Sequence, residues 1–215
     1  MDNAVALVQA FLRLHGYLTV TEFPVVRRAR HGGHECLTDL DVLGFRFGSA
    51  RSSNEATAED SVRLLGVSAG TADMLIGEVK EGRAELNTAA TQHDVLAAAL
   101  ERFGCCSHAD TDRLATELLR QGRTTTRHGH AVRLVAFGSL PPGHGDQRCH
   151  VVLLGDIVAE LRDYVRAHWE VLRASASKDP GLGMLLTLEK ASRGAKSAGI
   201  HGPTHAVRPP HPESQ

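Results

Sequence analysis

Asp73-Met74-Leu75-Ile76-Gly77-Glu78-Val79-Lys80 is the stretch whose pattern carries the fold prediction for this 215-residue chain. Its first part is mostly apolar, which predicts a buried strand, and it ends in Glu-x-Lys. Side chains alternate along a strand, so Glu78 and Lys80 share one face and Val79 lies on the other. Lys80 is the only lysine among the first 177 residues, whereas arginine is used elsewhere. An ammonium group two residues after a carboxylate therefore suggests a functional site.

A second acidic strand precedes this stretch. It is predicted over residues 37–47 and contains Thr38-Asp39-Leu40-Asp41-Val42-Leu43. Asp39 and Asp41 share a face, where a bound cation would relieve their repulsion. Carboxylates from neighbouring strands are the hard oxygen ligands that Mg²⁺ prefers. Asp41 and Glu78 are therefore the candidate ligands for Mg²⁺, which Mn²⁺ could replace.

The elements on either side complete a mixed α/β pattern. An apolar stripe predicts a first helix that Asp2 or Asn3 caps and Gly16 ends. The next helix is predicted from a cap at Thr88 or Thr91 to about residue 103. Further helices are expected over 110–120 and 157–172, and the other strands over 17–26, 131–137 and 150–154. The order α-β-β-β-α, another helix, then β-β-α predicts a mixed sheet flanked by helices.

We expect residues 1–175 to form a single domain. Residues 49–70 are rich in Ser, Ala, Glu and Asn around one apolar cluster at 62–67, which predicts a short helix inside a mobile insertion. An extra helix is expected within 176–192. Residues 193–215 are rich in Gly, Pro and His and have little to bury, which predicts a disordered tail.

Composition limits the kinds of partner. A hydrophobic content of 42% suffices for one good core. The formal net charge of -1 gives no general attraction to polyanions, so a nucleic acid would need a local basic patch. Arg27, Arg28 and Arg30 are the best candidates for that patch, and a solvated basic loop is the alternative.

Cysteine usage and hydropathy suggest a cytoplasmic protein. The four cysteines form no Cys-x-x-Cys pair and no evident disulfide framework, which fits a reducing compartment. No apolar run approaches the roughly 20 residues needed to span a bilayer, so we expect no membrane partner.

The two acidic strands and the α-β-β-β-α order resemble the PD-(D/E)xK nuclease superfamily, which has the restriction-endonuclease-like fold. The resemblance covers residues 5–103. Asp41 matches the Asp of the motif because apolar Val42 and Leu43 follow it, Glu78 matches the acidic position, and Lys80 matches the lysine. The resemblance implies that Asp41 and Glu78 hold a divalent cation and that Lys80 helps to orient the attacking water.

The resemblance also implies a function, a metal-dependent nuclease that hydrolyses phosphodiester bonds of DNA. Asp39, Glu22 and Gln9 are expected in supporting positions. Gln9 stands on the first helix where many relatives carry an extra acidic ligand, so the third ligand is left open. A homodimer would suit a nuclease that cuts both strands.

Two other functions compete with this one. The first is a nuclease-fold protein that has become a catalytically inactive binding or scaffold module. The second is a nucleotidyltransferase, in which Asp39 and Asp41 would lie against the Gly32-Gly33 turn with Lys80 remote. Convergence of Asp41, Glu78 and Lys80 on one space is the feature that separates the nuclease from both.

Overall fold

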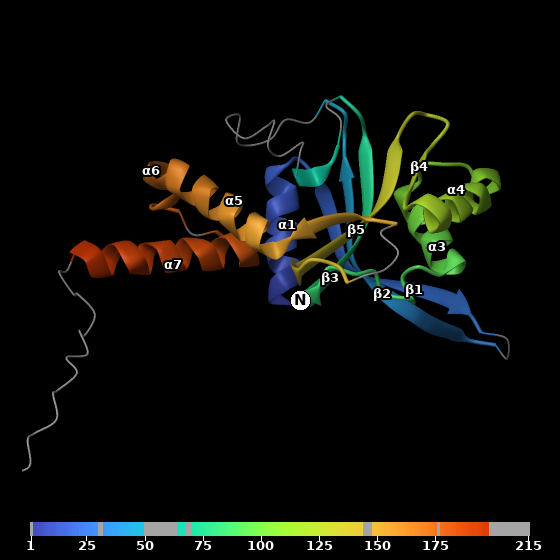
Figure 1. Cartoon of the computed structure of the whole chain (residues 1–215), viewed down its shortest axis with the longest axis horizontal. Coiled ribbons are helices and arrows are strands. Elements are labelled where there is room, and N and C mark those ends of the chain that lie inside the picture. Colours follow the sequence, from blue (N-terminus) through green and yellow to red (C-terminus); the bar gives the residue numbers. More distant parts are fainter. Residues whose placement is uncertain are drawn as a thin grey trace, which may run out of the picture.

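The computed structural model describes residues 2–29, 32–49, 64–67, 70–143, 148–175 and 177–197. Within these residues the chain is α/β, with one mixed open sheet of six strands flanked by helices, as the alternation of elements predicts (Figure 1). The strands are β1 (Leu18–Arg28), β2 (His34–Arg46), β3 (Asp73–Arg83), β4 (Arg123–Thr125), β5 (Ala131–Leu140) and β6 (His150–Leu153). The order across the sheet is β1-β2-β3-β5-β4, and β6 also pairs with β5.

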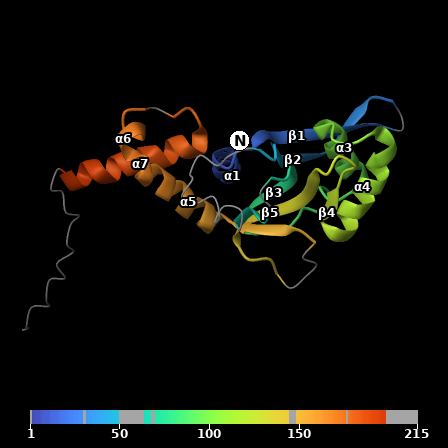
Figure 2. The same ribbon diagram turned by 90° about the horizontal axis from the view of Figure 1, so that it is seen from above.

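Strand directions explain the placement of the helices. β1, β2 and β3 are antiparallel neighbours, whereas β3 and β5 are parallel and need a crossover. The crossover contains α3 (His93–Phe103), α4 (His108–Gln121) and the short β4. The remaining helices are α1 (Asn3–Leu14), α5 (Leu154–Ala167), α6 (Trp169–Leu172) and α7 (Pro180–Ser197). Figure 2 shows α3 and α4 on one side of the sheet and α1, α5 and α7 on the other.

The alternation of β3 builds a core on each face of the sheet. Met74 and Ile76 pack with the buried side chains of α3 and α4, among them Val95, Leu96, Leu114 and Leu118. Leu75 points the other way and packs with Val8, Phe11, Ile157 and Leu161 of α1 and α5. Each such side chain contributes about 1.5 to 3 kcal/mol when fully buried. The two layers of helices therefore hold β3 in the middle of the sheet.

The first helix forms as the sequence predicts. Asp2 is its N-cap and accepts a hydrogen bond from the Ala4 N–H at 3.0 Å. Phe11 and Leu12 of its apolar stripe are fully buried. Gly16 follows with a φ of 80°, a left-handed conformation that suits glycine.

Several predicted boundaries are wrong. α3 begins at His93, because residues 87–91 form a turn in which the Thr91 N–H donates to Asn87 O at 3.2 Å. The helix expected over 157–172 starts at Leu154 and breaks at His168, whose backbone leaves the helical region at φ -103° and ψ 21°. The three-residue strand β4 was not predicted, because it is too short to show alternation.

The predicted insertion and tail lie mostly outside the described residues. Residues 50–63 and 68–69 of the insertion and 198–215 of the tail belong to that part. Leu65, from the described segment 64–67, is buried in the core beside α1 and α5. α7 covers the extra helix expected within 176–192 and continues to Ser197, so the first five residues of the predicted tail are helical.

A buried ion pair ties the start of β3 to β5. Arg133 donates from Nε to Asp73 Oδ1 at 2.9 Å and from Nη2 to Oδ2 at 3.0 Å. Tyr17 also donates its hydroxyl to Asp73, and burial followed by the Asp73 charge raises the pKa of that hydroxyl. Arg133 Nη1 donates to Leu65 O, which fastens segment 64–67 to the sheet. The buried charges are thus paired and hydrogen-bonded, as burial requires.

The state of the cysteines and the hydropathy of the helices can be compared with the sequence. Cys36, Cys105, Cys106 and Cys149 are all free thiols, in agreement with the absence of a disulfide framework. None of the helices in the described ranges is long and apolar enough to cross a membrane.

Close packing requires glycine at position 77. Gly77 pairs with Val42 in the last register position that joins β2 to β3. A Cβ atom at Gly77 would lie 2.5 Å from Val42 Cγ1 and 2.9 Å from Phe137 Cε2. Both side chains are fully buried and cannot move aside freely.

We therefore expect Gly77→Ala to lower the free energy of unfolding by about 1 to 3 kcal/mol through overpacking. Gly82→Ala, in the same strand, is the control, because a Cβ there meets nothing within 4 Å. Its effect should stay within about 0.5 kcal/mol. Chemical denaturation of both variants checks this, and equal stabilities would contradict the packing explanation.

Candidate functional site

The candidate site lies where β2 and β3 separate. Val42 and Gly77 form the last β2–β3 pair, and beyond it β2 pairs with β1 while β3 follows β5. Asp41 and Glu78 are the first residues past this pair on their strands. Asp41 Oδ2 accepts the Val79 N–H at 2.7 Å, so a side chain takes the place of a strand partner. We call this divergence of β2 and β3 beyond Val42 and Gly77 the strand fork. It places Asp41 and Glu78 at neighbouring positions on the two strands.

Glu78 is buried although it carries a carboxyl group, with only 7% of the residue exposed. Its Oε2 atom is buried and has no hydrogen-bond partner. The side chain borders a cavity of about 10 Å³, whose other lining residues are Leu40, Ile76, Gly77, Leu86, Ala90, Thr91 and Leu134. The pKa of Glu78 is raised to about 7. Burial is the largest cause and the charge of Asp41 adds to it, whereas Lys80 and the Asn87 side chain lower the pKa.

Asp41 lies at the centre of the charged groups. Burial raises its pKa, and the hydrogen bond from Val79 lowers it. The negative charges of Asp2 and Glu22 raise the pKa of Asp41 and the positive charge of Lys80 lowers it. Because Lys80 and Asp41 both act on Glu78, the structure brings the three predicted catalytic residues within electrostatic reach of one another.

Glu22 lies at the rim of this cluster in an unusual backbone conformation. Its φ of 52° makes it the one non-glycine residue with positive φ among those described. The β1–β2 register passes from Thr21–Val42 to Phe23–Leu40, so Glu22 sits at the level of Asp41. A left-handed non-glycine residue costs about 1 to 3 kcal/mol and is typical of functional sites. Glu22 therefore remains a candidate supporting residue, and its charge raises the pKa of Asp41.

Asp39 and Gln9 have neighbours that the sequence did not indicate. Asp39 is exposed on the β1–β2 hairpin opposite Pro24, and its Oδ1 lies 3.8 Å from Cys36 Sγ. Gln9 is buried and donates from Nε2 to Thr19 Oγ1 at 3.2 Å. Gln9 thus joins α1 to β1, and this contact accounts for its burial.

The predicted basic patch is partly neutralised. Arg27 Nε lies 2.5 Å from Glu35 Oε1, and Arg27 Nη1 lies 3.7 Å from Asp94 Oδ2 of α3. The backbone of Arg28 pairs with His34, and Arg30 lies outside the described residues. Arg27 is therefore engaged with acidic side chains in this structure.

Two residues that act on the candidate site were not predicted from the sequence. Asp2 was considered only as a helix cap, yet its charge acts on Asp41. Asn87, from the turn before α3, lowers the pKa of the Glu78 carboxyl. A residue nine positions from its partner, across a turn, leaves no periodic signal, so the sequence alone could not reveal Asn87.

The donor set fits a cation with few protein ligands. In the described ranges no group of three or more His, Cys, Asp or Glu side chains is arranged to hold a metal ion. Asp41 and Glu78 together offer two carboxylates, and Mg²⁺ commonly completes its shell with water and phosphate oxygens. The unpartnered Glu78 Oε2 fits such an ion, because a cation would satisfy an atom that the protein leaves unsatisfied.

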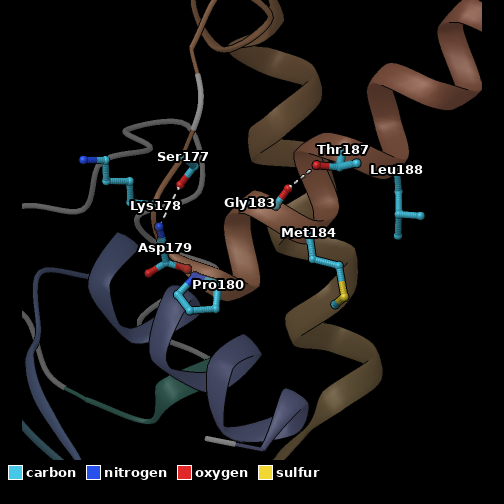
Figure 3. A pocket seen from close by; sticks show the side chains of 8 residues that line it. All are labelled: Ser177, Lys178, Asp179, Pro180, Gly183, Met184, Thr187 and Leu188. Atoms are coloured by element: carbon cyan, nitrogen blue, oxygen red, sulfur yellow. Dashed lines mark hydrogen bonds between the residues drawn. The ribbon is translucent and has the colours of Figure 1, made fainter.

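A larger surface pocket lies elsewhere and has no comparable chemistry. It has a volume of about 370 Å³ and is formed by residues 177–188 at the start of α7 (Figure 3). Asp179 there accepts the Leu182 N–H at 3.0 Å and pairs with Arg13 at 2.8 Å. Thr187 donates to Gly183 O, as Figure 3 shows. These polar groups serve the start of the helix and its packing on α1.

Comparison of the chain with protein family models, with curated proteins and with solved structures finds no match. The geometry and electrostatics of the fork must therefore support any functional proposal.

The buried Glu78 carboxyl should make stability depend on pH. Its pKa rises from 4.5 to about 7 in the folded state, so folding favours the protonated form. This contribution is fully present below about pH 4.5 and is lost as the pH rises through about 7. Between about pH 5 and pH 8, without divalent cations, the wild type should lose about 1 to 3 kcal/mol relative to Glu78→Gln.

Urea denaturation across this pH range measures the difference. Glu81→Gln is the control, because Glu81 is exposed on the same strand. Parallel stability curves for the wild type and Glu78→Gln would contradict a raised pKa at Glu78.

Proposed function

We propose that this protein is a metal-dependent nuclease that hydrolyses phosphodiester bonds of DNA, with Mg²⁺ or Mn²⁺ held by Asp41 and Glu78. The observation that carries the proposal is the buried, unpartnered Oε2 of Glu78 beside the charges of Asp41 and Lys80. The resemblance of Asp41, Glu78 and Lys80 to the PD-(D/E)xK motif supports DNA as the substrate. The fold class agrees with that resemblance at the level of a mixed sheet flanked by helices.

Each residue has a distinct role in this proposal. The Val79 N–H fixes one oxygen of Asp41 and leaves the other to bind a cation. Glu78 offers Oε2 from the neighbouring strand. Lys80 places a compact positive charge next to both carboxylates, where it can hold the attacking water and stabilise charge on phosphorus. A divalent cation bound there supplies Lewis-acid polarisation of the phosphate.

The geometry favours this function over nucleotidyl transfer. Gly32 and Gly33 form the turn at the far end of the β1–β2 hairpin, with φ of 87° and 83°. Asp41 lies seven residues along β2 from His34, a distance of about 23 Å at the rise of a strand. Lys80, which that class would place far away, acts on Asp41 instead.

A catalytically inactive scaffold is the alternative that an experiment must exclude. Its support is specific, since the carboxylate of Asp41 already has a structural partner in Val79. Two carboxylates are also fewer protein ligands than many metal sites use. The scaffold and the nuclease differ in what they require of Lys80.

Lys80→Ala separates the two functions. It removes one cation from the fork without opening the core, so the fold and cation binding should persist. Cleavage of DNA with Mg²⁺ should fall by at least about 100-fold, the scale of losing one group that stabilises the transition state. Lys178→Ala, which removes an exposed lysine at the start of the α7 segment, should cleave like the wild type.

Asp41→Asn tests the metal directly. Asparagine keeps an oxygen that can accept the Val79 N–H, so the strand fork should survive. Loss of the charge should abolish both cation binding and cleavage, whereas Asp112→Asn, at an exposed aspartate of α4 away from the site, should change neither. Gel assays with single-stranded, duplex and branched DNA, and calorimetry with Mg²⁺ and Mn²⁺, measure the outcome. No cleavage and no binding that depends on Asp41 would favour the scaffold.

A further inference from the structure

A stretch of sequence poor in acidic residues runs from the end of α4 to the start of α5. Between Glu117 and Asp156 the chain carries five arginines but one acidic residue, Asp146. Arg133 is buried in its ion pair with Asp73. The other arginines of this stretch are exposed, at positions 120, 123, 127 and 148. Positive charge therefore gathers on the surface formed by this part of the chain.

Two of the exposed arginines have no acidic partner in the part of the chain that the structure describes. Arg127 Nε lies 3.0 Å from Asp110 Oδ1, so its charge is compensated. The side chains of Arg120 and Arg123 form no ion pair and no hydrogen bond with any described residue. Glu117, just before the stretch, already accepts hydrogen bonds from other side chains. Two guanidinium groups are thus exposed to solvent and can bind an anion.

A close contact at Gly122 brings a third arginine to these two. Gly122 ends α4 with a φ of 68°, and a Cβ atom there would lie 1.6 Å from Arg148 O. Arg148 Nη1 donates to Leu119 O at 2.7 Å, a contact that serves the carboxyl end of α4. Arg120 and Arg123 lie on either side of Gly122, so the fold places three arginines around one glycine. We call Arg120, Arg123 and Arg148 the β4 basic patch.

The backbone of β4 adds hydrogen-bond donors to this patch. β4 is the last strand on its side of the sheet. The Leu134 N–H donates to Gly122 O at 2.8 Å and the Thr126 N–H donates to His130 O at 2.9 Å. Because antiparallel pairing alternates, the N–H groups of Arg123 and Thr125 are directed away from β5. Arginine and threonine side chains and backbone N–H groups are the usual donors to phosphate oxygens of nucleic acids.

The polar neighbours of the patch favour a nucleic acid over a membrane surface. Gln121 and Thr125 are exposed beside the arginines. The large apolar side chains that are exposed in the described ranges all lie outside residues 118–130 and position 148. Segments that bind at a membrane surface insert apolar side chains between the lipids, and this patch has none to insert.

We propose that the β4 basic patch and the exposed edge of β4 bind the phosphate backbone of a nucleic acid. This surface is distinct from the predicted patch on the β1–β2 hairpin, where Arg27 is engaged with Glu35 and Asp94. Binding there requires neither a metal ion nor cleavage, so it does not depend on the proposed nuclease activity. Because each neutralised phosphate releases counterions, the logarithm of the affinity should fall with the logarithm of salt concentration by about 0.9 per phosphate on duplex DNA.

Arg120→Gln combined with Arg123→Gln tests this surface. Neither side chain has a hydrogen bond with a described residue, so the melting temperature should stay close to that of the wild type. Fluorescence anisotropy with labelled duplex and single-stranded DNA, in EDTA and over a range of KCl concentrations, measures affinity. The salt slope on duplex DNA should fall by about 2, and affinity near ~0.1 M salt should fall by about 10-fold or more.

Arg162→Gln combined with Arg166→Gln is the matched control. It removes the same charge from exposed positions of α5, which lies at the opposite end of the molecule from β4 (Figure 1). This variant should bind DNA like the wild type. An equal loss of affinity in the control would show an effect of net charge and would overturn the proposal.

Asp41→Asn, titrated in the same way, separates this inference from the proposed function, because it should keep DNA binding in EDTA. A wild type that binds no DNA in EDTA, or an Arg120 and Arg123 double variant with unchanged affinity and salt slope, overturns the surface and leaves the metal site standing. Tighter binding to vesicles of phosphatidylserine and phosphatidylcholine than to DNA also overturns it. If the double variant does not fold, Arg123→Gln alone is titrated, and a salt slope equal to that of the wild type overturns the proposal.

Discussion

The separation of β2 from β3 after the Val42–Gly77 pair is the constraint on which the candidate site depends. Gly77 allows Val42 and Phe137 to meet across the strand, and no side chain fits between them. Past that point the backbone of β3 loses β2 as a neighbour, and Asp41 supplies the missing acceptor to Val79. The same departure leaves Glu78 among apolar side chains with one oxygen unsatisfied. The divergence of β2 and β3 after this pair therefore determines the surroundings of both carboxylates.

β3 carries two buried acids with opposite surroundings. Asp73, at its start, receives two hydrogen bonds from Arg133 and one from Tyr17, so its charge is fully compensated. Glu78, five residues and about 17 Å further along, has an unpartnered oxygen and a raised pKa. The hydrogen bonds of Asp73 join β3 to β5, so its burial has a structural explanation. The burial of Glu78 has no such explanation, because a buried polar group left without a partner costs about 1 to 3 kcal/mol.

Those features of the fold that depend on local periodicity could be predicted from the sequence. Alternation predicted strand β3 and the shared face of Glu78 and Lys80, and the short polar side chain of Asp2 predicted the cap of α1. The positive φ of Glu22, the effect of Asn87 on the pKa of Glu78 and the pairing of Arg27 with Asp94 depend on which elements meet in space. These features depend on the tertiary arrangement, and the hydrophobic periodicity of one sequence predicts only local elements.

Protonation and cation binding are the two ways in which the protein can relieve the cost at Glu78. A pKa of about 7 means that the proton is held weakly near neutral pH, so a cation can displace it there without great cost. A module that served only as a scaffold would gain stability from an apolar residue in this cavity, because burial of the side chain would then be unopposed. An ionisable group beside Asp41 and Lys80 lowers that stability. Functional sites are where proteins commonly depart from the rule that buried side chains are apolar.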